Sequence, residues 1–309
     1  MNEVIYKIKK VLKPFVKNIS NKKVRGFIIY LHNKSSELIF RSAVMKYYKN
    51  TDSEKIDPEK KAVLNFLKTN PFNLFPYDFI KKYKRSDIKI FTDKNNGLKY
   101  GLLDGKKLYF KRSCTEKEAQ NIFSGLILEQ DLESPHRYLN NTFDVSSDDI
   151  VVDIGAAEGD FALSIVDKVK KIYIFEADFE LIESLQATFE PWKEKIIIVN
   201  KYVSNTNKEQ FTTLDSFFED KEMPTFFKVD IEGAELDMIY GSNKILSTTL
   251  STKVVMATYH KHDDEMVLGE TLRKLGFHTE FSKGYMLSTW DGVIKAPFFR
   301  RALIRAIKQ

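Results

Sequence analysis

The chain has 309 residues but only one cysteine, and it contains no long apolar run. A single cysteine, Cys114, excludes an intrachain disulfide and any cysteine-rich zinc site, so a reducing interior is the natural setting. The longest apolar runs, 27–31 and 196–199, are far shorter than the roughly 18 residues of a membrane-spanning helix. The start of the chain lacks the apolar stretch of a secretory signal. We therefore expect a soluble, cytoplasmic protein.

Apolar side chains are plentiful by contrast. They make up 43% of the residues, and aromatic ones 13%, which excludes a wholly disordered chain. The length suffices for one large domain or two smaller ones. A change of character near residue 111 predicts two regions. We interpret residues 1–111 as an accessory region of helices followed by short antiparallel strands, and residues 112–309 as a second domain with a basic C-terminal helix.

Positive charge is concentrated at both ends of the chain. Residues 1–34 carry nine Lys or Arg against one acid, and residues 291–309 carry five against one, although the whole chain has a net charge of only +6. Apolar residues recur at helical spacing over 4–19 and 298–307, which predicts a basic amphipathic helix at each end, the first kinked by Pro14. Such helices either pack on the body with their cations in water, or contact an anionic membrane at its inner face, or bind nucleic acid.

The accessory region ends in a predicted hairpin and is followed by a well-marked helix. Three short strand-like runs lie at 88–91, 98–100 and 108–110. Asp104-Gly105 between the last two is a strong hairpin signal, so we expect a small antiparallel sheet. Thr115, with Glu118 three residues later, predicts a capping box and a helix that runs to about Glu129.

Apolar runs then alternate regularly with helical segments. The runs lie at 150–154, 172–175, 196–199, 226–231 and 254–257. Alternation of this kind predicts a parallel sheet that is buried on both faces. Two further runs, 277–281 and 285–290, are joined by only three residues, so they must be antiparallel. The sequence thus predicts an α/β domain with a seven-stranded, mostly parallel sheet whose last strand is antiparallel.

A glycine turn with several carboxylates follows the first of these strands, within residues 151–161. A ligand is expected there, because a strand ends and a helix begins at this point. A dinucleotide fingerprint is not met, since Ala157 and Asp160 stand at its second and third glycines. Asp153, Glu158 and Asp160 would each cost about 1–4 kcal/mol beside a pyrophosphate. They favour a ligand with a sulfonium and an ammonium group, which predicts S-adenosylmethionine (SAM).

The following strands supply further predicted contacts to this cofactor. Glu176 ends the second strand, where a carboxylate can accept both ribose hydroxyls of an adenosine. We expect the segment 134–138, just before the core, to fold over the site, with Arg137 either a contact or a surface charge. The full set of predicted cofactor contacts is Asp153, Gly155, Ala156, Glu158, Gly159, Phe161, Glu176, Ala177, Val203, Ser204 and Asp230.

These blocks come in an order that resembles the FkbM family of SAM-dependent methyltransferases. The resembling segments are 153–161, 175–178, 213–217, 227–236 and 259–260, and the Lys-x-Asp-x-Glu-Gly-Ala-Glu block at 228–235 is the most family-specific. The resemblance covers about residues 130–290. It implies a class I (Rossmann-like) methyltransferase fold for 112–309 and O-methylation of a sugar hydroxyl on a glycan, glycolipid or natural product. Three positions depart from the family pattern, namely Ala157, Phe179 and the Thr258-Tyr259-His260 triplet.

A hydroxyl acceptor must lose a proton during methyl transfer, and three residues are predicted to serve the catalysis. His260 follows the fifth strand, while Asp230 and Glu232 follow the fourth, so all three lie at the same edge of the sheet. His260 is our favoured base, and Asp230 or Glu232 is the alternative. Glu232 and Glu235 can also be interpreted as a helix-start acid and a fold contact.

The segment 260–265 approaches a metallo-hydrolase signature, because it combines two histidines with three acids. Glu265 replaces the last histidine of that signature. Asp263 and Asp264 also suit the N-terminus of a helix over 266–275. We therefore assign no metal ligand.

Two other functions are compatible with the basic ends. The first is RNA methylation, but the chain lacks an Asn/Asp-Pro-Pro-Tyr/Phe block, and Cys114 lies in no pair placed for covalent attack on a base. We therefore expect no nucleic-acid partner. The second is a non-catalytic, membrane-associated module that retains a SAM-binding fold. Neither the acceptor nor the oligomeric state is encoded in a recognisable motif.

Overall fold

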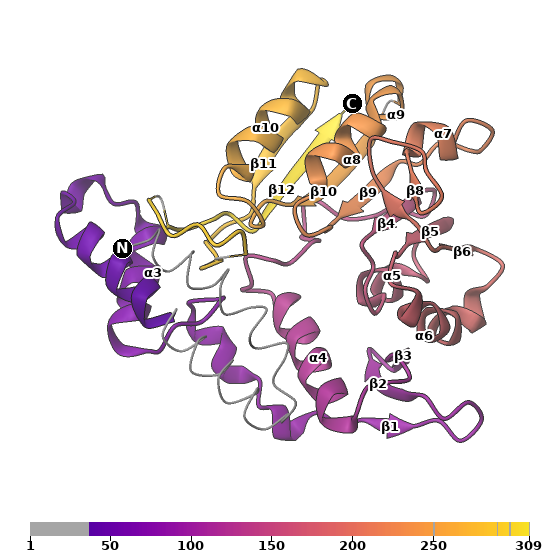
Figure 1. The fold of residues 1–309 in the computed structure, drawn as a ribbon, viewed down its shortest axis with the longest axis horizontal. Coiled ribbons are helices and arrows are strands. Elements are labelled where there is room, and N and C mark those ends of the chain that lie inside the picture. The colour runs from indigo at the N-terminus through magenta and orange to yellow at the C-terminus, as the bar shows by residue number, and fades with distance from the viewer. Residues whose placement is uncertain (1–36, 250, 289, 297, 309) are drawn as a thin grey trace. The chain divides into compact units, whose positions relative to one another are not determined.

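The computed structural model describes residues 37–308 except 250, 289 and 297 (Figure 1). The helix predicted over 4–19 lies outside these residues. The chain divides into two compact units, with the boundaries after Tyr77, Lys283 and Arg300. The predicted boundary at residue 111 is therefore wrong, because the small sheet before it belongs to the second unit.

The first unit is helical and closes around one apolar core. Residues 37–49 are helical. They are followed by η1 (Ser53–Lys55) and α3 (Pro58–Thr69). Asp57 caps α3, since its side chain accepts a hydrogen bond from the backbone N–H of Lys60. The core includes Phe40, Val44, Leu67, Tyr285 and Phe299.

The second unit begins with short helices, a small sheet and a long helix. These elements are η2 (Asp78–Lys82), η3 (Arg85–Asp87), β1 (Phe91–Thr92), β2 (Lys99–Leu103), β3 (Lys106–Tyr109) and α4 (Glu116–Glu129). The predicted antiparallel sheet is confirmed, with Asp104 and Gly105 both at positive φ in the hairpin turn. The predicted capping box of Thr115 and Glu118 is also present at the start of α4. Tyr109 N–H donates to the Thr188 hydroxyl, which joins β3 to α6 (Phe179–Phe189).

A seven-stranded sheet forms the core of this unit. Its strands are β4 (Ile150–Ile154), β5 (Lys171–Phe175), β6 (Ile196–Val199), β9 (Phe226–Val229), β10 (Thr252–Ala257), β11 (His278–Phe281) and β12 (Leu303–Lys308). The spatial order is β11-β12-β10-β9-β4-β5-β6. All neighbours are parallel except that β12 runs antiparallel to both β10 and β11. The predicted α/β sheet is confirmed in strand number and in its single antiparallel strand.

Helices and short strands connect the members of this sheet. They are α5 (Asp160–Ile165), α6 (Phe179–Phe189), η4 (Glu190–Trp192), α7 (Leu214–Phe217), α8 (Glu235–Gly241), α9 (Asn243–Thr248) and α10 (Asp264–Lys274), with the parallel pair β7 (Tyr202–Val203) and β8 (Phe211–Thr212). The central strands β4, β9 and β10 are mostly buried on both faces, and Ile154, Phe227 and Val229 are fully buried. Figure 1 shows α5 and α6 at the lower right, near one end of the sheet, and α10 at the top, near the other end. Burial on both faces explains the continuous apolar runs of the sequence.

The C-terminal segment is a strand and not the predicted basic helix. Residues 303–306 are buried without interruption, as expected for a strand inserted between two others. A short apolar run of this kind has no decisive period, which is why the helical interpretation was wrong. The predicted hairpin partner of β11 is wrong for the same reason. Residues 285–290 lie in the first unit, and Met286 forms only an isolated bridge with Arg300.

Two cationic side chains of the C-terminal strand donate hydrogen bonds to backbone carbonyl oxygens of the second unit. Arg305 is only 8% exposed, and its guanidinium donates to the carbonyl oxygens of Arg137 and Tyr138 at 2.6 and 3.1 Å. Lys308 Nζ donates to the carbonyl oxygens of Leu246 and Ser247 at the end of α9. These contacts hold β12 and the segment before β4 in place. Within the described part of the chain, no helix is both long and apolar enough to cross a membrane.

Candidate active site

Three neighbouring strands bring the predicted site residues to one edge of the sheet. Strands β4, β9 and β10 are adjacent and parallel, so their carboxyl ends meet. The glycine turn follows β4, Asp230 follows β9, and Tyr259 with His260 follows β10. The spatial neighbourhood that the sequence predicts for these residues is therefore present.

The glycine turn is fixed by its backbone conformation and by Glu176. Gly155 and Gly159 have φ of +72° and +84°, which favour glycine over any other residue. A Cβ atom at Gly155 would stand 2.0 Å from the carbonyl oxygen of Asp230, so β4 and β9 can approach closely only without one. The carboxylate of Glu176 accepts hydrogen bonds from the backbone N–H groups of Ala157 and Asp178, each at 2.8 Å. The turn and the end of β5 are thus joined.

Several carboxylates around this turn have too little positive charge near them to balance their own negative charge. Burial and the charges of Glu129 and Glu158 together raise the pKa of Asp160 to about 7, while Lys228 opposes the change. Burial also raises the pKa of Glu129, Glu158 and Glu176. A cation bound near these groups would favour their ionised forms. The turn is therefore electrostatically suited to a positively charged ligand.

Lys228 and Asp153 form a buried ion pair beneath the turn. Lys228 Nζ lies 3.1 Å from the Asp153 carboxylate and donates to the carbonyl oxygen of Gly155 at 2.7 Å. Burial opposes the charge of Lys228, but the nearby carboxylates of Asp153 and Asp230 outweigh it and raise the pKa. Asp153 is 0% exposed, so its predicted direct contact with the cofactor is not supported. Its position makes it the counter-ion of Lys228.

Asp230 lies at the centre of a group of two histidines and two tyrosines. Its Oδ2 accepts a hydrogen bond from Tyr138 Oη at 2.8 Å and lies 3.3 Å from His136 Nε2. Its Oδ1 lies 3.3 Å from Tyr259 Oη and 3.4 Å from His260 Nε2. Burial alone would raise the pKa of Asp230, but the adjacent His136 together with the charges of Lys228 and His260 outweighs burial, and the pKa lies well below its usual range. Asp230 is therefore ionised at neutral pH.

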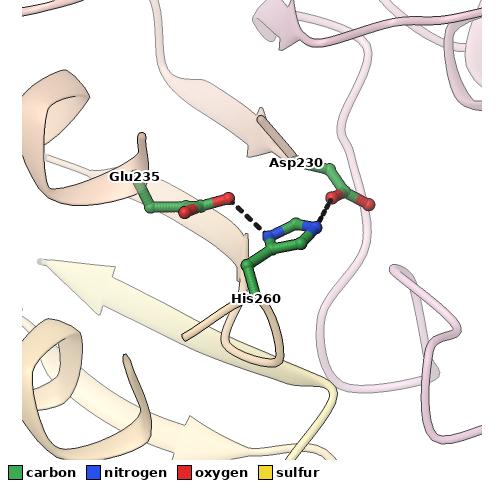
Figure 2. Close-up of side chains that lie close together, drawn as sticks. All are labelled: Asp230, Glu235 and His260. Carbon is green, nitrogen blue, oxygen red and sulfur yellow. Dashed lines mark hydrogen bonds and ion pairs between the residues drawn. The ribbon is translucent and has the colours of Figure 1, made fainter. Parts of the chain in front are cut away.

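His260 stands between two carboxylates, as Figure 2 shows. Its Nδ1 lies 2.8 Å from Glu235 Oε1, while its Nε2 faces Asp230. The same oxygen of Glu235 accepts from the backbone N–H groups of Ile231 and Gly233, which fix its position. Burial would lower the pKa of His260, but Glu235 and Asp230 raise it above the usual value. Glu235 thus orients the ring and stabilises its protonated form.

Among the described residues, one trio of side chains is close enough to offer ligand atoms to a metal ion. It consists of Asp230, Glu235 and His260. The two carboxylates face opposite nitrogens of the imidazole ring (Figure 2). The ligand atoms of the trio lie within 4.8 Å of one another, and each ring nitrogen of His260 also faces a carboxylate, so the same three side chains form a hydrogen-bonded relay.

Two predicted site residues are placed elsewhere. Glu232 is exposed, has φ of +57° and does not join the Asp230 group, whereas Glu235 is 1% exposed and does. Arg137 is tied to backbone carbonyl oxygens of Gln130 and Leu139. Glu232 and Arg137 therefore lie outside the Asp230 group. The positive φ of Glu232 turns the chain, and the N–H of Arg137 closes a turn by donating to the Ser134 carbonyl oxygen, with His136 and Tyr138 buried on either side of Arg137.

The remaining predicted contacts surround the turn at different depths. Ala156, Gly159 and Phe161 are buried, and the Phe161 ring lies edge-on to Tyr138. Glu158 and Ala177 are half-buried. Val203 ends β7, and Ser204 N–H donates to the Thr212 carbonyl oxygen of β8. Sequence reasoning placed the segment 134–138 over the site but assigned no role to His136 or Tyr138 within it, and it assigned none to Glu129, Tyr259 or Lys228.

Residues 186–285 match the family model described as the methyltransferase FkbM domain. The match includes the block at 228–235 and begins after the glycine turn. It confirms the resemblance predicted from the sequence. The strand order, with its one antiparallel strand, is that of the predicted class I methyltransferase fold. A search among curated proteins found no match.

Several solved structures are similar to this one. A methyltransferase FkbM from Methylobacillus flagellatus KT has 17% identity and a TM-score of 0.44, and the alignment covers 63% of this chain and 56% of that chain. A precorrin-6y C5,15-methyltransferase from Geobacter metallireducens GS-15 has 14% identity, a TM-score of 0.39 and coverage of 53% and 82%. An rRNA methylase from Streptococcus thermophilus has 13% identity, a TM-score of 0.34 and coverage of 53% and 90%.

The Glu235–His260 pair yields a direct prediction. Glu235→Gln keeps the size of the side chain but removes its charge, so the pKa of His260 should fall toward its ordinary value. Titration of the His260 ring signals by NMR measures this change. Glu232→Gln is the matched control, because this acid is exposed in the same turn and should leave the titration unchanged. An unaltered His260 titration in Glu235→Gln would contradict the assignment.

Proposed function

We propose that this protein, whose residues 186–285 form a methyltransferase FkbM domain, transfers the methyl group of SAM to a sugar hydroxyl of a glycan, glycolipid or natural product. One observation carries the proposal. A glycine turn surrounded by insufficiently neutralised carboxylates lies beside a buried aspartate–histidine–glutamate relay at the same edge of the sheet. The first feature suits a cationic methyl donor, and the second suits removal of a proton from a hydroxyl.

The donor side of the site fits SAM, which supplies an electrophilic methyl group on a cationic sulfur when bound. Asp160 and Glu158 come from the turn, and Glu129 comes from the end of α4. Their partial burial without enough positive charge is unfavourable, and a sulfonium or ammonium group nearby would reduce that cost. Glu176, held by two backbone N–H groups at the end of β5, has the position at which a carboxylate binds a ribose diol.

The acceptor side is built around Asp230 and His260. The Asp230 side chain is 15% exposed, whereas His260 is 2% exposed, so an incoming hydroxyl meets Asp230 first. We assign to Asp230 the orientation of this hydroxyl and to His260 Nε2 the final acceptance of its proton. Glu235 stabilises the resulting imidazolium, as a carboxylate does in other histidine relays. Because His260 must be neutral to accept a proton, the rate should rise with pH through its elevated pKa.

Positioning should contribute more to the rate than proton removal. Alignment of nucleophile and methyl group in line can be equivalent to an effective molarity of about 10⁵–10⁸ M, whereas a general base adds roughly 10²–10⁴-fold. Asp230 alone is a weaker base than His260, since its carboxylate is held by four neighbouring groups and its pKa is low. This difference supports His260 as the proton acceptor.

Donor binding can be tested with Glu176→Ala. Wild-type protein should bind SAM in isothermal titration calorimetry, and the variant should bind it about 10–100-fold more weakly, because hydrogen bonds to a charged acceptor are lost. Glu183→Ala is the control. It removes an exposed acid of α6 and should retain the wild-type affinity for SAM. Absence of SAM binding by the wild-type protein would refute the proposal.

Methyl transfer can be tested with label from methyl-tritiated SAM. Wild-type protein should transfer label to a carbohydrate in a mixture of hexoses and nucleotide sugars. His260→Ala should reduce kcat roughly 10²–10⁴-fold while retaining SAM binding. His278→Ala, which changes an exposed histidine of β11, is the control. Label transferred to RNA instead of carbohydrate would contradict the acceptor class.

A further inference from the structure

The two oxygens of Asp230 are held by two different segments of the chain. Oδ2 contacts His136 and Tyr138, which precede β4. Oδ1 contacts Tyr259 and His260, which follow β10, and Tyr259 Oη also lies 3.5 Å from Oδ2. These segments are far apart in the sequence and meet at this one carboxylate. The orientation of Asp230 therefore depends on both of them.

The two histidines have closely matching surroundings. Each ring directs Nε2 toward Asp230, at 3.3 Å for His136 and 3.4 Å for His260. Each directs Nδ1 toward a glutamate, Glu129 at 4.0 Å and Glu235 at 2.8 Å. Both rings are buried, with exposures of 1% and 2%. Five ionisable groups thus alternate as acid and base, with Asp230 in the middle.

We infer that His136 is a positioning residue of the methyl-transfer centre, which, backed by Glu129, keeps Asp230 ionised and aimed at His260. This inference rests on the proposed function, since it assigns His136 a part in the same proton relay. His136 acts through Asp230 and does not itself meet the acceptor. An ionised Asp230 beside His260 Nε2 increases the basicity of that ring, so loss of His136 should weaken the proton acceptor.

The groups that face His136 agree with this role. The carboxylates of Asp230 and Glu129 favour its protonated form, burial and the charge of Lys228 oppose it, and the net pKa is raised. The rings of Tyr138 and Tyr259 lie edge-on to it at centroid distances of 5.1 and 5.3 Å. The charge of Asp230 therefore explains why an imidazole occupies this buried position. An apolar side chain here could not stabilise the Asp230 carboxylate.

The backbone that carries His136 is held independently of its ring. Arg305 donates to the carbonyl oxygens of the next two residues, Arg137 and Tyr138. The Ser134 hydroxyl accepts from the His136 N–H. A substitution of the imidazole should therefore leave the segment in place, which makes the side chain itself open to test.

The test compares His136→Gln and His136→Ala with His278→Gln, a control at an exposed position of β11. In His136→Gln we expect His260 to titrate at lower pH by NMR and the rising limb of kcat to move in the same direction. We expect kcat to fall by up to about 100-fold through misplacement of Asp230, with SAM affinity unchanged. His136→Ala should lose more, because glutamine retains a neutral donor and partly rescues the orientation.

Three results would overturn the inference: an unshifted His260 titration in both His136 variants, an unchanged pH profile, or equal losses of kcat in the glutamine and alanine variants. If circular dichroism shows that a His136 variant does not fold, Glu129→Gln takes its place in the test. This variant leaves the imidazole in place and should shift the pKa of His260 in the same direction. If the wild-type protein transfers no methyl group, the proposed function fails, while the NMR titration still decides the coupling between His136 and His260.

Discussion

The candidate site depends on the stabilisation of one buried carboxylate at the end of a central strand. Asp230 follows β9, and it remains ionised there because imidazole and phenol groups surround it and the charge of Lys228 is near. Those groups come from the segment before β4 and from the end of β10. The requirement therefore links the C-terminal strand to the chemistry, since Arg305 of β12 holds the backbone that carries His136 and Tyr138.

A second buried charge supports the donor side. Lys228 neutralises Asp153 and donates to the Gly155 carbonyl oxygen, so one cation stabilises the strand beneath the turn and fixes the turn itself. It does not neutralise the outer carboxylates, among them Asp160 and Glu129. Lys228 thus neutralises the carboxylate that is packed within the sheet. The carboxylates at the place where a cationic donor would bind are not neutralised. The sequence block Lys-x-Asp places both central charges two residues apart on β9 and its end.

Local patterns predicted the sheet and the glycine turn, because strand burial and turn glycines are written in short stretches of sequence. The capping box at Thr115 was predicted for the same reason. The C-terminal strand was missed, since residues 303–307 have no distinguishing period, and only their neighbours β10 and β11 make them a strand. His136 and Glu129 were missed because their meeting with Asp230 depends on how α4 and the following segment pack. Glu235 contacts His260 where Glu232 was predicted at the site, because Glu232 and Gly233 have positive φ and turn the chain between Asp230 and Glu235.

The most direct test of this account is a crystal structure of the protein with S-adenosylhomocysteine. The account predicts that the ribose hydroxyls bind Glu176, that the amino group lies near the carboxylates of the glycine turn, and that the sulfur faces the side of the site formed by Asp230. A nucleoside bound away from Glu176, or a sulfur turned away from Asp230, would contradict it.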